Sequence, residues 1–192
     1  MIVDPRRQLS DPPHCSPLDR SPRQPAAPGR PKLLIIDAIG PFFRHYKRKL
    51  INWSKVPFSH LETEDGLRPE YLETIPDDFR KFVQSARGLG YNGVTLDDVA
   101  HLAPYDAYPA PLQAKIAAYR ALYGRLFQIS AEEGMSVYLT MDAMFYNDEL
   151  RQRLGNSRTR AIRWLGSCLD EVLRAFPAVA GIIMRFGETD GV

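Results

Sequence analysis

Short apolar runs alternate with segments of helical periodicity from residue 32 onward. Each run has the length of a strand, and they span residues 32–37, 92–97, 136–142 and 180–186. Apolar residues spaced three and four positions apart predict longer helices at 76–89, 111–133 and 157–176, with a short helical turn at 147–154. Crossovers of this length require parallel pairing of the strands. The pattern therefore predicts an α/β fold.

The two faces of the predicted strands differ in polarity, because alternate residues of a strand point to opposite sides. One register is apolar throughout: Leu34 and Ile36; Val94 and Leu96; Val137, Leu139 and Met141; Ile182, Met184 and Phe186. The other register becomes polar toward the carboxyl end of every strand, with Asp37, Asp97, Asp142 and Arg185. A doubly wound sheet needs two apolar faces, whereas a polar second face suits a barrel interior. The pattern favours four β/α units resembling the N-terminal half of a (β/α)8 TIM barrel over a small flavodoxin-like sheet.

A change in composition divides the chain near residue 32. Residues 1–31 are rich in Pro, Arg, Ser and Asp and contain few apolar side chains, so we expect a disordered leader. Residues 32–192 form the predicted partial (β/α) barrel. Because an eight-stranded barrel needs further β/α units, we expect this catalytic domain to be incomplete and inactive alone. An open barrel edge also predicts self-association through the edge strand.

Composition and charge exclude several classes of partner. Among the 192 residues, basic and acidic side chains nearly balance at a formal charge of +2, which predicts no nucleic-acid binding. No apolar run approaches the roughly 20 residues of a membrane span, and no export signal is present, so a cytoplasmic location is expected. The two cysteines have no metal-ligand spacing, and neither a metal nor a cofactor is expected.

Glu188 is the best candidate for a catalytic side chain. It lies just beyond the fourth strand, at the edge of a parallel sheet where ligand sites are built. Gly187 allows the backbone to turn before it, and Arg185 supplies a positive charge on the preceding strand. Burial would make Glu188 a proton donor, whereas Arg185 would hold it ionised, and both roles stay open here.

Further polar and aromatic residues are predicted on the same side of the sheet. Asp37, Asp97 and Asp142 end three strands, and Trp53 belongs to a group of aromatic residues in the connections. Asp98 is adjacent to Asp97, and neighbouring strand residues diverge, so at most one of the two is expected to face a ligand. Aromatic platforms beside carboxylates suit the apolar faces and hydroxyl rims of sugar rings.

Two segments carry a resemblance to barrel-type glycoside hydrolases. Residues 90–98, GYNGVTLDD, and 180–188, AGIIMRFGE, resemble the second and fourth strands of these enzymes. Many of these families have the proton donor at the end of the fourth strand, a position that corresponds to Glu188. The commonest motif has Asn before this Glu, and this chain has Gly187. The resemblance implies cleavage of a glycosidic bond by paired carboxylates, with the second one on a later strand.

In this interpretation Arg185 and Asp97 position the sugar or tune Glu188, while Asp37, Trp53 and Asp142 line the cleft. Two alternatives stay open. Asp37, Asp97, Asp142 and Glu188 also form an allowed set of oxygen ligands for a divalent cation, as in a metal-dependent barrel isomerase or aldolase. The second alternative is a non-catalytic α/β interaction domain, whose Pro-rich leader would recruit a partner.

Overall fold

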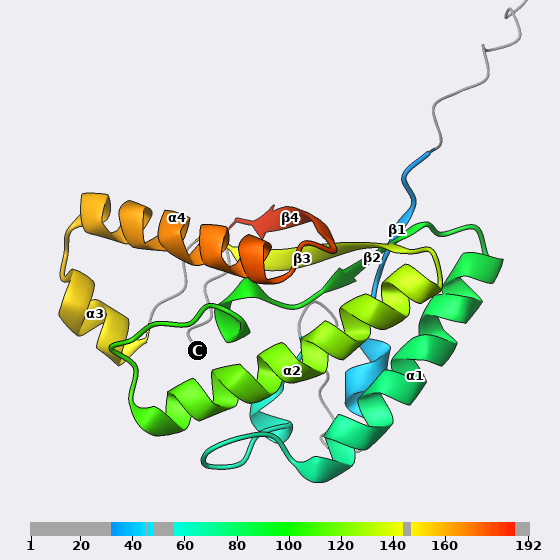
Figure 1. Ribbon diagram of the computed structural model, residues 1–192, viewed down its shortest axis with the longest axis horizontal. Helices are drawn as coiled ribbons and strands as arrows, with labels where there is room; N and C mark the ends of the chain where they lie inside the picture. The colour runs from blue at the N-terminus through cyan, green and yellow to red at the C-terminus, as the bar shows by residue number, and fades with distance from the viewer. Residues whose placement is uncertain (1–31, 45, 48–55, 144–146, 187–192) are drawn as a thin grey trace, which may run out of the picture. The chain divides into compact units, whose positions relative to one another are not determined.

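A four-stranded parallel sheet forms the centre of the computed structural model, which describes residues 32–44, 46–47, 56–143 and 147–186 (Figure 1). The strands lie in chain order: β1 (Ile35–Asp37), β2 (Gly93–Leu96), β3 (Ser136–Asp142) and β4 (Val179–Arg185). The helices between them are α1 (Pro69–Gly88), α2 (Ala110–Glu132), α3 (Asp148–Leu154) and α4 (Arg158–Ala175), with 3-10 turns η1 (Gly40–Phe43), η2 (Phe58–His60) and η3 (Val99–His101). The predicted α/β class and parallel pairing are confirmed. The predicted leader, Trp53 and Glu188 lie outside the described residues.

Helix α2 lies between α1 and α4 and contacts both. It packs against α1, and Arg120 of α2 donates two hydrogen bonds to Glu171 of α4, at 2.9 and 2.8 Å. The Arg120 guanidinium also lies 5.0 Å from the centre of the Phe176 ring, just after α4. The three helices therefore form one layer.

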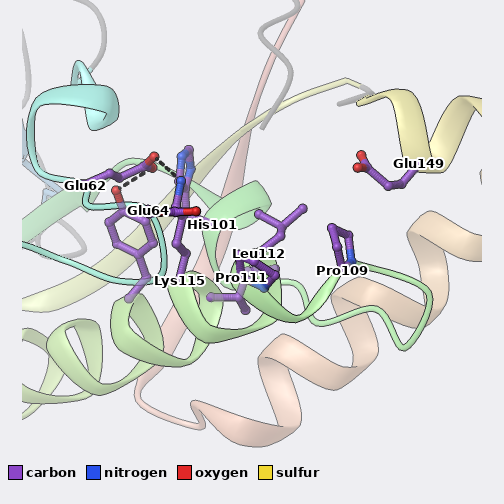
Figure 2. A pocket seen from close by; sticks show the side chains of 10 residues that line it. Glu62, Glu64, His101, Pro109, Pro111, Leu112, Lys115 and Glu149 are labelled. Carbon is purple, nitrogen blue, oxygen red and sulfur yellow. Dashed lines mark hydrogen bonds and ion pairs between the residues drawn. The ribbon is translucent and has the colours of Figure 1, made fainter.

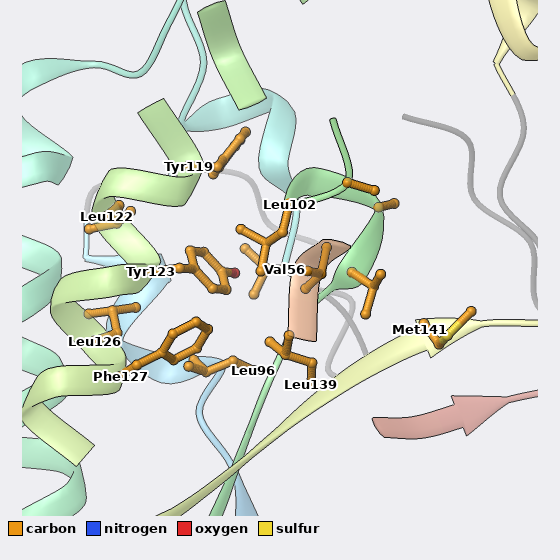
Figure 3. Close-up of a cluster of buried hydrophobic side chains, with 14 of the residues drawn as sticks. Val56, Leu96, Leu102, Tyr119, Leu122, Tyr123, Leu126, Phe127, Leu139 and Met141 are labelled. Atoms are coloured by element: carbon orange, nitrogen blue, oxygen red, sulfur yellow. The ribbon is translucent and has the colours of Figure 1, made fainter. Parts of the chain in front are cut away.

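The apolar register of the sheet is buried in the hydrophobic core together with α2. Leu96 of β2 and Leu139 of β3 are almost fully buried, and Figure 3 shows Phe127 of α2 pointing toward them. This register was predicted to pack against helices, and the prediction is confirmed for β2 and β3. Burial decreases on β4: Met184 is 42% exposed, and Phe186, just after the strand, is 79% exposed. Strand β4 is an edge of the sheet in the described part of the chain.

Helix α1 begins earlier than the sequence predicted. Its first residue is Pro69, whereas Pro76 was expected to open the helix and lies inside it. A proline within a helix has no N–H to donate to the carbonyl four residues before it, here that of Leu72. The Leu72 carbonyl instead accepts a hydrogen bond of 2.9 Å from Arg125 of α2. This contact between helices satisfies the group that Pro76 leaves unbonded.

Tyr138 fills part of the polar face of the sheet. It pairs with Thr95 on one side and Gly181 on the other, and its ring reaches toward both neighbouring strands. A Cβ atom at Gly93 or at Gly181 would lie 3.3 Å from atoms of this ring, which is tighter than ordinary contact. The two glycines therefore provide the space in which the ring packs.

No helix in the described part of the chain combines the length and the apolar composition that crossing a bilayer requires. Cys168 is a free thiol in α4, and burial raises its pKa to about 12, so the thiol stays protonated near neutral pH. Its surroundings are those of a small core residue.

Replacement of Leu139 by Ala tests the assignment of the core. Leu139 is 0% exposed, so Leu139→Ala should lower the free energy of unfolding by about 2–5 kcal/mol in urea titrations. The same substitution at Leu89, which is 78% exposed, is the matched control and should change it by less than about 0.5 kcal/mol. Equal effects of the two substitutions would contradict the assignment.

Candidate active site

Arg185 connects the carboxyl ends of three strands. Its Nη1 donates to Asp97 Oδ1 at 3.1 Å, and its Nε donates to Asp142 Oδ1 at 3.2 Å. Its Nη2 lies 3.7 Å from Asp98 Oδ2. Asp97 and Asp98 follow β2, Asp142 ends β3, and Arg185 ends β4, so parallel pairing in chain order brings these groups to one edge. The guanidinium thereby contacts three carboxyl groups at once.

Asp97 is held by three hydrogen bonds from different elements. Besides Arg185, its side chain accepts from the Thr140 hydroxyl at 2.6 Å and from the Val56 backbone N–H at 2.8 Å. Burial, together with the charge of the adjacent Asp98, raises the pKa of Asp97 above its ordinary value, although these hydrogen bonds and Arg185 act to lower it. The side chain is thus strongly held, while its environment disfavours the charge.

A pocket of about 250 Å³ opens beside Arg185 on the polar face of the sheet. Its lining combines two carboxylates, two hydroxyls, the guanidinium and apolar side chains: Asp37, Asp97, Thr95, Thr140, Arg185, Ala38, Ile39 and Ile183. Asp37 is exposed and accepts a hydrogen bond from the Thr95 hydroxyl. The pocket therefore offers hydrogen-bond acceptors, a fixed cation and an apolar wall within a small volume.

Of the predicted residues, Asp37, Asp97 and Arg185 lie together around this pocket. Asp142 is only 2% exposed and is not part of the lining, and it contacts Arg185 instead. Asp97 lines the pocket and the adjacent Asp98 does not, as expected for neighbouring positions of a strand. Trp53 and Glu188 stay predictions, since they lie outside the described residues.

Three groups of this site were not predicted from the sequence. Thr95 and Thr140 line the pocket, and they could have been found, because they share the register of Asp97 and Asp142. The Val56 N–H comes from the connection after β1, where no periodic pattern indicates which backbone group turns inward. Its donation to Asp97 had no signal in the sequence.

A second pocket, of about 290 Å³, lies at the start of α2 (Figure 2). Glu62 holds two of its residues in place, accepting from Tyr119 at 3.0 Å and from Lys115 at 3.2 Å. His101 is also part of its lining, and its Nδ1 lies 2.9 Å from Asp98 Oδ1. His101 and Asp98 thus lie between the second pocket and Arg185.

In the part of the chain that the structure describes, no group of three or more His, Cys, Asp and Glu side chains is arranged to hold a metal ion. Asp97 and Asp142, two members of the oxygen set considered from the sequence, both bond to the Arg185 guanidinium. Comparison of the chain with protein-family models, with curated proteins and with solved structures finds no match.

The raised pKa of Asp97 predicts a pH effect on stability. When the folded pKa lies above the unfolded one, the folded state binds more protons in the interval between them, so stability falls as pH rises through it. The unfolding free energy of the wild type minus that of Asp97→Asn should therefore decrease from about pH 4 upward and then level off. Urea titrations at several pH values measure this difference. An increase with pH would mean that Arg185 and the hydrogen bonds outweigh burial.

Proposed function

We propose that this chain contains the first four β/α units of a barrel-type glycoside hydrolase and that the pocket beside Arg185 binds a sugar ring. The observation that carries the proposal is the position of Arg185, which bonds to carboxylates of two neighbouring parallel strands at the ends where such folds bind ligands. Sequential strand order and the polar second face also fit a barrel.

The chemistry of the pocket fits a sugar. Sugar hydroxyls donate and accept hydrogen bonds, and Asp37 and Asp97 are acceptors for them, while Arg185 is a donor. Ala38, Ile39 and Ile183 provide an apolar wall that suits the C–H face of a ring. A volume of about 250 Å³ suits one ring and not a long chain.

Glu188 is the proposed proton donor in this mechanism. It follows Arg185 by three positions in the sequence. Asp97 and Arg185 would position the sugar, and Asp142 would keep the guanidinium in place. Glycosidases use a second carboxylate as nucleophile or base, which we assign to a further β/α unit.

Replacement of Glu188 by Gln tests the proton donor. The substitution keeps the shape and removes the acid, so turnover of a glycoside with a poor leaving group should fall by roughly 100- to 10,000-fold. An activated aryl glycoside needs little protonation and should lose much less. Glu73→Gln changes an exposed Glu on α1 and is the control. These measurements use the protein with the further β/α units present. There, unchanged turnover in Glu188→Gln would remove Glu188 from the mechanism, and a wild type that cleaves no aryl glycoside would contradict the proposed function.

Replacement of Arg185 by Lys tests the sugar pocket. Lysine keeps the charge but loses the planar group that contacts several carboxylates at once, so kcat/KM should fall by about 5- to 150-fold, equivalent to 1–3 kcal/mol. Arg120→Lys is a matched control, because Arg120 also forms paired hydrogen bonds, to Glu171 in the helix layer. Both variants lose a comparable ion pair, and only Arg185→Lys should affect turnover. Equal losses would indicate a purely structural role for Arg185.

A further inference from the structure

Asp98 is the third carboxyl group beside Arg185, and it is held differently from the other two. Its Oδ2 lies 3.7 Å from Arg185 Nη2, which is longer than the contacts of Asp97 and Asp142. Its other oxygen lies 2.9 Å from His101 Nδ1. An ionised carboxylate is only an acceptor, so the imidazole donates this hydrogen bond through Nδ1–H. Asp98 therefore bridges His101 and Arg185.

The imidazole of His101 is itself fixed by aromatic rings. The Phe58 ring stacks on it with centroids 3.5 Å apart and an interplanar angle of 21°, and Tyr119 meets it edge-on at 5.0 Å. The Tyr119 hydroxyl in turn donates to Glu62 at 3.0 Å. His101 is only 8% exposed, so its ring has little freedom to rotate away from Asp98.

Adjacent carboxylates at one guanidinium repel each other, and additional hydrogen-bond donors to each of them offset this repulsion. Asp97 has the Thr140 hydroxyl and the Val56 N–H for this purpose. His101 provides the corresponding donor for Asp98. Phe58, which stacks on His101, lies two residues after Val56, so a single connection after β1 contributes to holding both carboxylates.

We infer that His101 is a positioning residue that orients Asp98 and, through it, the Arg185 guanidinium beside the pocket. This inference deepens the proposed function and rests on it for the effect on turnover. The effect on Arg185 itself can be measured without any substrate.

The test compares His101→Leu, His101→Asn and Asp98→Asn in the full chain. The first removes the donor, the second retains a side-chain N–H near the position of Nδ1, and the third keeps the shape of Asp98 without its charge. The Nε–H signal of Arg185 in 15N NMR spectra, assigned by its loss in Arg185→Lys, reports how firmly the guanidinium is held. In His101→Leu and Asp98→Asn its exchange with solvent should accelerate at least roughly fivefold. His101→Asn should restore slow exchange in part.

A double variant tests whether His101 acts through Asp98. His101→Leu combined with Asp98→Asn should accelerate exchange no more than either change alone, and kcat/KM on an activated aryl glycoside should follow the same order. Additive effects, or Arg185 exchange that is unchanged in Asp98→Asn, would overturn the inference even if His101→Leu fails to fold. Activity is measured in the protein with the further β/α units present. If that protein cleaves no glycoside but Arg185 exchange responds as expected, the positioning role stands and the proposed function fails. If it cleaves glycosides and Arg185 exchange does not respond, the proposed function stands and the positioning role fails.

Discussion

The polar edge of this sheet depends on one guanidinium among three carboxyl groups. Asp97, Asp98 and Asp142 are all at least nine-tenths buried, and burial of a carboxylate without a partner is strongly unfavourable. Arg185 contacts all three. The Thr140 hydroxyl donates to the same oxygen of Asp97 as Arg185, the Val56 backbone N–H donates to the other oxygen of Asp97, and His101 donates to the oxygen of Asp98 that faces away from Arg185. Because these donors come from different elements, the cluster exists only when β2, β3, β4 and the connection after β1 are assembled.

Helix α2 also restricts the position of this polar cluster. Tyr123 of α2, fully buried in the core, donates its hydroxyl to the backbone carbonyl of Asp97. The helix layer therefore contacts the polar edge directly as well as covering the apolar face. The packing of α2 on the sheet and the orientation of Asp97 are therefore coupled. A substitution that shifts α2 in the core would change the position of Asp97 through this hydrogen bond.

The sequence predicted those features that repeat with a regular period. Alternation along the strands placed Asp37, Asp97, Asp142 and Arg185 on one face, and the predicted limits of β3 agree with the structure. The predicted start of α1 was wrong, because Pro76 has the local pattern of a first helical residue. The hydrogen bond that satisfies the Leu72 carbonyl comes from Arg125, which is distant in sequence and cannot be found from that pattern. The Val56 donation and the contact of Asp98 with Arg185 depend on irregular backbone, which no periodic pattern describes. Glu188, the predicted catalytic residue, lies outside the described residues.

The packing of Tyr138 has a consequence for the route of any ligand. Its ring takes up the space that Gly93 and Gly181 leave on the neighbouring strands, and it lies on the same face of β3 as Thr140 of the pocket lining, two residues closer to the amino end of the strand. A ligand in the pocket cannot extend along β3 toward this end without displacing the ring. Additional length of a ligand along the strands is then accommodated on the side of the connecting loops. Discrimination among ligands of different length would therefore evolve by changes in these loops, while the strands beneath stay constant.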